Sequence, residues 1–300
     1  MKTTAKQFTA FGNTAIVQVA TDPLTKFSFR PGGPEMKTGG LLISELTEGG
    51  VVGKLTALNN TDSYLLLTDA DVLIGAKQNR IVNKSVLLAP FSKTVLDVSC
   101  IERLRWSYSG KNFSSPGSAA DHGLRKAKAS TMSFLKTEPG AAADTQGKVW
   151  SHIYNSLAKE GMHQETESYY ALSGHIHEKK VKEFPVCEPE KGCTGIAVFA
   201  DGRVQSIDIF GNTEVYGYYF PLLRDAAFRM ADTGKKMKEP DIHEAFYKTL
   251  DAMEAWELAE KKDEGNNPGA GRLELRESEL LIGFDLSLNS EMIHRAVFQK

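Results

Sequence analysis

One stretch of the sequence, residues 72–106, concentrates side chains of the kind that bind ligands. Its candidate binding residues are Lys77, Gln78, Asn79, Arg80, Asn83, Glu102, Arg105 and Trp106. A lysine, an amide and a planar guanidinium in close succession suit a phosphate, a pyrophosphate or a carboxylate. A solvated turn whose charges point at water is the alternative. The stretch matches neither a P-loop nor a dinucleotide-binding glycine fingerprint, so it lends no support to those mechanisms.

Glu102 is the candidate for proton transfer in this stretch. A carboxylate near the end of a strand could act as a general acid or base, or form an ion pair with Arg80 or Arg105, which is the commoner fate. Alternation along residues 95–100 places Cys100 on the apolar face of that strand, which favours a buried core thiol over a nucleophile. Trp106 is expected to pack in the core, with a base-stacking surface as the alternative.

Short β-strands are expected to position these residues. Runs 72–74, 85–88 and 95–100 have strand character, and Gly75 permits the sharp turn that presents residues 76–80. Upstream, the predicted strands are residues 14–19, 24–30, 41–46, 53–58 and 64–67. The NNTD sequence between the last two predicts a hairpin, and the Pro- and Gly-rich residues 30–40 predict an irregular surface loop.

The second half of the chain mixes helices and strands. Apolar residues at four-residue spacing predict a helix over 146–161, and Pro221 and Pro240 are expected to open two more. A further helix is expected over residues 165–172. In the helix after Pro240, the core residues are expected to be Phe246, Leu250, Met253 and Trp256. Strands are predicted at 195–200, 204–210, 273–276, 280–286 and 293–298, with the first two joined at Asp201-Gly202.

These elements predict a single α+β domain over residues 1–300. A β-rich framework, residues 1–106, is completed by strands from a mixed lobe, residues 147–300, with three or more helices packed on it. Residues 107–146 are rich in Ser, Gly and Ala and leave directly from the candidate site. They are expected to form a lid or a disordered insertion with a short helix near 124–135. His294 is expected in the core or at an edge, with an approach to the site as the alternative.

Composition limits the classes of function. The 300 residues are 41% hydrophobic and 25% charged, and the net charge of −2 provides no general attraction to nucleic acid or to a membrane surface. Three cysteines and no apolar run of membrane-spanning length favour a cytoplasmic protein without a disulfide framework. His175, His177, Cys187 and Cys193 do not have the spacing of familiar zinc sites, so no metal is expected.

Two motifs in residues 72–106, GAKQNRIVN and VSCIERLRW, resemble the signature of a bacterial family, the ADP-ribosylglycohydrolase- and rhodanese-phosphatase-associated protein domain. The matching positions are Gly75, Ala76, Lys77, Gln78, Asn79, Arg80, Asn83, Ser99, Cys100, Glu102, Arg105 and Trp106. Later segments are similar too: residues 146–150, 195–210 and 221–224, with His294 and Phe298 near the end. One departure is Leu104, where the SCxExGRW pattern has glycine.

The resemblance implies a role around ADP-ribosyl or NAD-derived metabolites and specifies no cofactor. Three functions follow as hypotheses: an enzyme acting on an anionic, nucleotide-like small molecule, a non-catalytic sensor of the same ligand, and an interaction or scaffold protein. In the first two, Lys77, Gln78 and Arg80 hold phosphate, and in the enzyme Glu102 is the acid or base. In the third, the polar cluster is an internal salt-bridge network.

Overall fold

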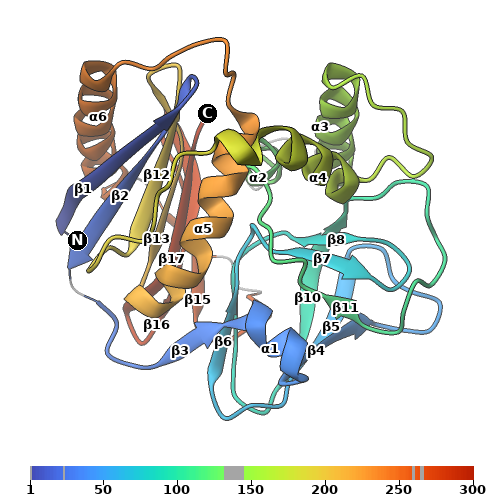
Figure 1. Cartoon of the computed structure of the whole chain (residues 1–300). Coiled ribbons are helices and arrows are strands. Elements are labelled where there is room, and N and C mark those ends of the chain that lie inside the picture. Colours follow the sequence, from blue (N-terminus) through green and yellow to red (C-terminus); the bar gives the residue numbers. More distant parts are fainter. Residues whose placement is uncertain (1, 23, 132–144, 259–260, 264–266) are drawn as a thin grey trace.

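The computed structural model of the protein describes residues 2–22, 24–131, 145–258, 261–263 and 267–300. Within these ranges the chain forms three β-sheets and six α-helices, which confirms the predicted α+β class (Figure 1). A large sheet makes one half of the molecule and a small curved sheet makes the other, with helices between them. None of the helices in these ranges combines the length and apolar character needed to cross a bilayer.

The large sheet has eight antiparallel strands drawn from both ends of the chain. In spatial order they are β1 (Lys2–Phe11), β2 (Thr14–Asp22), β12 (Gly195–Ala200), β13 (Arg203–Phe210), β17 (Glu291–Gln299), β16 (Leu281–Leu288), β15 (Arg272–Glu277) and β14 (Lys261–Asp263). Because β2 pairs with β12, N-terminal strands are completed by C-terminal ones, as predicted.

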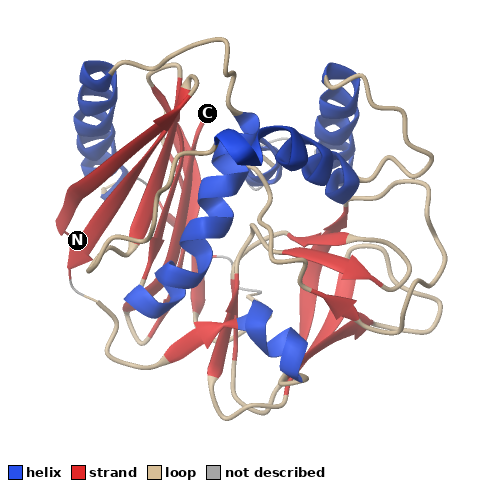
Figure 2. Ribbon diagram, in the orientation of Figure 1, coloured by secondary structure: helices blue, strands red, loops and turns tan. Residues whose placement is uncertain are grey.

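Helices cover both faces of this sheet. Helix α5 (Thr213–Met230) packs on one face and α6 (Glu239–Glu257) on the other (Figure 2). Alternate residues of β2 therefore enter different cores: Ile16 lies in the cluster under α5, and Val17 lies in the cluster under α6. The second cluster contains Phe246, Met253 and Trp256, which confirms the predicted core stripe.

The small sheet curves into a barrel that carries the signature motifs. Its strands, in spatial order, are β11 (Phe113–Ser114), β7 (Val72–Gly75), β8 (Arg80–Val82), β10 (Lys93–Cys100), β5 (Lys54–Asn59) and β4 (Leu41–Glu45). A bridge between Ser44 and Asn112 brings the edges β4 and β11 together. Leu, Ile and Val side chains fill the interior, so the barrel is packed and not a pore.

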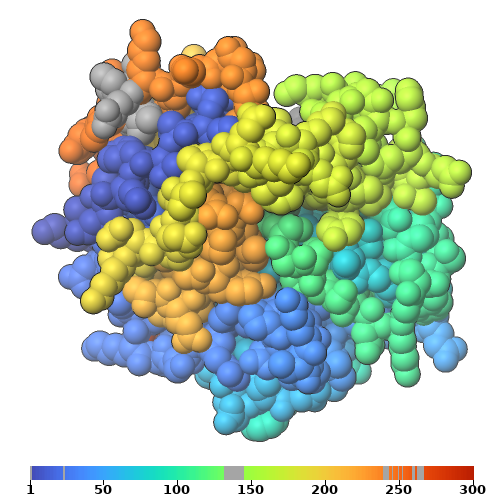
Figure 3. Space-filling view, viewed as in Figure 1, coloured from blue at the N-terminus to red at the C-terminus, as the bar shows by residue number. Residues whose placement is uncertain are grey.

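A three-stranded sheet and four further helices complete the fold. The sheet contains β3 (Phe29–Pro31), β6 (Tyr64–Leu67) and β9 (Val86–Leu88). The helices are α1 (Gly32–Thr38), α2 (His122–Ala129), α3 (Thr145–Lys159) and α4 (Tyr169–Lys180), which is followed by the short η1 (Val181–Glu183). The predicted apolar face of α3 is confirmed: Val149, Ile153 and Leu157 are buried against Leu172 of α4. The chain around α4 forms a band across the surface between the two halves (Figure 3).

Three local predictions are wrong, and capping and turn residues explain the first two. Residues 30–40 contain helix α1, because Pro34 is tolerated in its first turn and Gly39, at φ 82°, ends it. Helix α5 starts at Thr213 and takes Pro221 into its interior, because the side chain of Asn212 caps the helix by accepting from the Val215 N–H at 2.8 Å. The predicted strand 24–30 is reduced to β3.

The predicted NNTD hairpin is also wrong. Strand β5 belongs to the barrel, whereas β6 belongs to the three-stranded sheet. The Asn59 amide donates to the Ser63 carbonyl at 2.8 Å and to the Ala89 carbonyl at 2.9 Å, which turns the chain away from the barrel. By contrast, the Asp201-Gly202 hairpin is confirmed, with φ of 48° and 74° at its two turn residues, as a tight two-residue turn requires.

The segment 107–146 is only partly described. Its described part contains β11 and α2, and α2 corresponds to the short helix predicted near 124–135. Residues 132–144 lie outside the described residues, so a lid or a disordered insertion stays a prediction.

Candidate functional site

The signature turn begins where β7 ends. Gly75 adopts φ 124°, and a Cβ built there would lie 2.8 Å from the Asn112 carbonyl oxygen, so only glycine fits without a shift. Residues 76–79 make the turn and Arg80 opens β8. The turn is therefore where the sequence predicts it, but the Arg80 side chain points inward and is completely buried.

Glu102 is held in an ion pair. Its Oε2 lies 2.6 Å from Arg105 Nη2 and accepts from Arg105 Nε at 2.8 Å and from the Asn79 N–H at 3.2 Å. Arg105 also donates to the carbonyls of Ala76 (2.8 Å) and Ser107 (2.9 Å). Pairing with Arg105, one of the two alternatives open from the sequence, is thus present, and a role in proton transfer stays a prediction.

Lys77 and Trp106 also contact each other. Lys77 Nζ donates to the Gly49 carbonyl at 2.7 Å and lies 5.5 Å from the ring centre of Trp106 and 5.0 Å from that of Tyr108. These are cation–π distances. Trp106 is 45% exposed, so the prediction that it packs in the core is wrong.

The remaining signature residues lie in two places: the network around Arg105, and a separate hollow beside Asn83. Arg80 Nη1 donates to Gln78 Oε1 at 3.0 Å, and Asn79 Oδ1 accepts from Arg105 Nη2 at 3.2 Å, so these residues join the network. Asn83 instead accepts from Ser99 Oγ at 2.8 Å and borders a separate hollow. Cys100 is buried, as predicted, and burial raises the pKa of its thiol.

A second polar network, which sequence reasoning missed, lies between the two halves. Arg125 of α2 binds Asp69 through Nε and Nη2, both at 2.9 Å, and Asp208 of β13 through Nη1 at 2.9 Å. His294 Nε2 lies 3.3 Å from Asp208, and its Nδ1 lies 2.8 Å from Ser85 Oγ. Burial opposes ionisation of Asp208, but Arg125 and His294 outweigh it and lower the pKa of that carboxyl to about 2.

This network contains the residue types of a hydrolytic triad in a place that substrate cannot reach. Ser85 and His294 are 0% exposed and Asp208 is 1% exposed. A nucleophile needs access to the bond that it attacks, and Asp208 is already neutralised by Arg125. The network therefore joins the large sheet to the barrel side. The prediction that His294 is a core histidine is confirmed.

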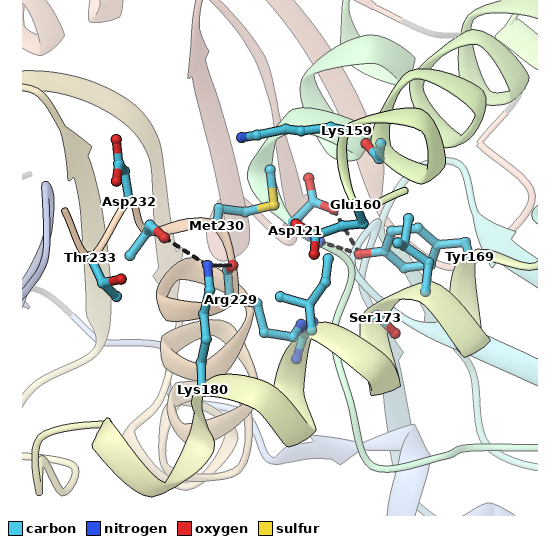
Figure 4. A pocket seen from close by; sticks show the side chains of 14 residues that line it. Asp121, Lys159, Glu160, Tyr169, Ser173, Lys180, Arg229, Met230, Asp232 and Thr233 are labelled. Atoms are coloured by element: carbon cyan, nitrogen blue, oxygen red, sulfur yellow. Dashed lines mark hydrogen bonds between the residues drawn. The ribbon is translucent and has the colours of Figure 1, made fainter. Parts of the chain in front are cut away.

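A cavity of about 350 Å³ lies between α3, α4 and the C-terminal end of α5 (Figure 4). Asp121, which caps α2, sits in its wall: Oδ1 accepts from the Leu124 N–H at 2.9 Å and Oδ2 accepts from the Tyr169 hydroxyl at 2.8 Å. His152 Nε2 lies 3.4 Å from Asp121 Oδ1. Burial opposes both charges, but the pairing lowers the pKa of Asp121 and raises that of His152.

Arg229 is the unusual residue of this cavity. It is only 5% exposed, and its Nη2 donates to the Ala119 carbonyl at 2.6 Å. Among the described residues Arg229 has no carboxylate within 4.0 Å, whereas Arg125, which is slightly more buried, has two. Nearby, Lys180 Nζ donates to the carbonyls of Arg229 (2.8 Å) and Ala231 (2.7 Å), and burial lowers the pKa of this lysine (Figure 4).

The sequence carried a signal for Arg229. It interrupts the apolar end of the predicted helix, between Phe228 and Met230, where a charge has to be buried. The motif taken from this helix, residues 221–224, stops short of it. As for metals, the described residues contain no group of three or more His, Cys, Asp or Glu side chains placed to hold an ion.

Comparison with known proteins gives one match. No curated protein and no solved structure matches the chain. Residues 2–298 match the family described as the ARG and Rhodanese-Phosphatase-superfamily-associated Protein domain, ARPP-1. The match covers nearly the whole chain, including the barrel, the large sheet and the helices between them. The protein therefore belongs to the ARPP-1 family.

Proposed function

We propose that the protein binds a phosphate-containing metabolite of the ADP-ribosyl or NAD-derived class in the cavity between α3, α4 and α5. The observation that carries this proposal is the burial of Arg229 without a carboxylate partner among the described residues. The association of the family with ADP-ribosylglycohydrolase proteins supports the class of ligand.

A buried guanidinium is unfavourable unless its charge is compensated. The bond to the Ala119 carbonyl and the position of Arg229 in the last turn of α5 give partial compensation. A phosphate would complete it, because the planar fork of arginine matches phosphate oxygens in two-point contacts.

The rest of the cavity suits a ribosyl group and a base. Carboxylates of Asp121 and Glu160 can accept hydrogen bonds from sugar hydroxyls, and Leu172, Ile176 and Met230 provide an apolar wall. The volume of about 350 Å³ falls at the lower end of the range for small-molecule sites. Anion, polyol and apolar contacts are thus available together.

Isothermal titration with ADP-ribose, AMP and inorganic phosphate tests the proposal. Arg229→Gln is expected to weaken binding more than about tenfold, since it removes a charge-assisted contact of roughly 1.5–3 kcal/mol. Arg203→Gln, the same change at an exposed position on β13, is the matched control and should bind as the wild type does. Equal affinity of Arg229→Gln and wild type would remove this cavity from consideration.

A second candidate location is the mouth of the barrel. Lys77, Gln78, Asn79, Arg80, Arg105 and Trp106 would hold the phosphate there, Asn83 would act from its neighbouring hollow, and Glu102 would be the acid or base. Three buried atoms favour it: among the described residues, Glu45 Oε2 and the Nε and Nη2 of Arg80 have no hydrogen-bond partner, and the closest charge contact is Arg80 Nη2 to Glu45 Oε1 at 3.9 Å. A hollow of about 680 Å³ borders Glu45 and Tyr108. Loss of binding in Lys77→Ala, with Arg229→Gln unaffected, would move the site here.

The interaction or scaffold hypothesis is supported by the pairing of Glu102 with Arg105 and of Lys77 with the two aromatic rings. Under that hypothesis the signature network holds the barrel turns in register and binds nothing. It predicts no heat of binding for ADP-ribose, AMP or inorganic phosphate, whether the protein is wild type, Arg229→Gln or Lys77→Ala.

A further inference from the structure

A second hollow, of about 240 Å³, adjoins the cavity on the neighbouring face of α4. Tyr169, Leu172 and Ile176 line the first cavity, and Tyr170, Gly174 and His177 line the second. Tyr170 and His177 each follow a residue of the first set, Tyr169 and Ile176, by one position, which is a rotation of about 100° around the helix. Ser173 and Arg229 line both hollows, so these side chains lie at the boundary between them.

We infer that the two hollows form one two-part site, for a ligand in which a central pyrophosphate at Arg229 carries an organic group at each end. This inference rests on the proposed function and narrows its ligand from any phosphorylated ribosyl compound to a two-ended ester. A guanidinium has five N–H donors in a planar fork, enough to contact oxygens of two adjacent phosphates.

The second hollow has the features of a subsite. The Tyr170 side chain is 38% exposed, which leaves ring surface for a base or a sugar. His177 Nδ1 is a buried polar atom that has no hydrogen-bond partner in the described part of the chain, and such atoms are normally satisfied in native proteins. The same residue lines the hollow, so its ring is a candidate contact for a ligand there.

Gly174 gives a way to fill this hollow alone. A Cβ built on Gly174 meets no atom of the described residues within 4 Å, so a larger side chain can enter the hollow without a clash at its first atom. Leucine also favours a helix more than glycine does, so Gly174→Leu is expected to fold. A Cβ on Gly217, in α5, likewise has no neighbour within 4 Å in the ranges that the structure describes. Gly217 lies outside the linings of both hollows, which makes Gly217→Leu the matched control.

The test is the affinity of ADP-ribose compared with its two halves, AMP and ribose 5-phosphate. Wild type is expected to bind ADP-ribose at least about tenfold more tightly than either half, because the second end binds at high effective concentration. Gly174→Leu should abolish most of that gain while one half keeps its affinity within about twofold, and Gly217→Leu should change neither. Circular dichroism establishes that both variants are folded.

Two results would overturn the inference: no gain of ADP-ribose over its halves in wild type, or a gain that survives Gly174→Leu. Neither result removes the proposed function, which requires only binding that depends on Arg229. Conversely, if no phosphorylated compound binds with dependence on Arg229, both are wrong.

Discussion

Asp69 and Asp208 bind the same guanidinium from opposite halves of the molecule. Asp69 follows β6 on the barrel side, Asp208 lies on β13 of the large sheet, and Arg125 of α2 contacts both at 2.9 Å. All three side chains are about 2% exposed. Each charge is therefore compensated inside the protein, and α2 acts as the joint between the halves.

Arg125→Met is expected to destabilise the fold strongly. It leaves two buried carboxylates without their cation, and breaking a buried pair from one side costs roughly 3–5 kcal/mol. Urea unfolding at neutral pH measures the change, with Arg203→Met on the exposed end of β13 as the control at less than about 0.5 kcal/mol. A loss of less than about 1 kcal/mol in Arg125→Met would contradict a structural role for the network.

Arg229→Met is expected to behave differently, although Arg229 is almost as buried. Methionine retains the apolar packing and removes a charge that has no carboxylate partner among the described residues, so the free energy of unfolding without ligand should change by less than about 1 kcal/mol. The same urea series measures it. If Arg229→Met loses as much stability as Arg125→Met, then Arg229 has a structural role and its burial is no argument for a ligand.

Features set by local sequence could be predicted, whereas features set by long-range contacts, such as the partners of these two arginines, could not. Local patterns predicted individual helices and turns. The four-residue spacing of Val149, Ile153 and Leu157 predicted α3, and Asp201-Gly202 predicted the hairpin between β12 and β13. The framework of N-terminal strands completed by C-terminal ones was also predictable. The sequence could not predict which strands pair with each other, because β5 and β6 are adjacent in sequence and yet belong to different sheets.

The candidate site divides in the same way. The signature motifs predicted which residues gather around the turn after Gly75, since those residues are close in sequence. The Arg229 cavity is built from α3, α4, α5 and the residue that caps α2, and only tertiary packing brings these together. Ion pairing also depends on how the side chains pack in three dimensions, so the sequence could not decide whether Glu102 pairs with Arg80 or with Arg105.

Glu102→Gln tests the role of the signature network. Glutamine keeps the shape of the side chain and loses the charge, so the bonds from Arg105 and Asn79 weaken and the fold should lose about 1–3 kcal/mol. A double-mutant cycle with Arg105→Ala should give a coupling energy above about 0.5 kcal/mol between the two side chains. Affinity for ADP-ribose is expected to stay within about twofold of wild type. Loss of turnover of ADP-ribose, with binding retained, would instead support Glu102 as the acid or base.

Lys128 makes stability depend on pH above neutrality. This lysine is 1% exposed, and its Nζ donates to the carbonyls of Asp69 and Val82, each at 2.5 Å. Burial lowers its pKa from 10.5 to about 7, with Arg125 acting in the same direction and Asp69 and Asp71 opposing it. Between those two values the unfolded chain holds a proton that the folded chain has released. Because the unfolded state binds more protons, stability must rise with pH through this window.

Lys128→Met removes the titrating group, so the difference between wild type and this variant reports the contribution of Lys128 alone. The difference in free energy of unfolding, wild type minus Lys128→Met, is expected to be constant below about pH 6 and to grow in favour of wild type up to about pH 9.5. Urea unfolding at intervals of pH measures the difference, and Lys235→Met, at an exposed position, should give a flat one. A difference that stays flat for Lys128→Met would mean that the buried ammonium keeps its proton, and that its two carbonyl bonds compensate the charge in full.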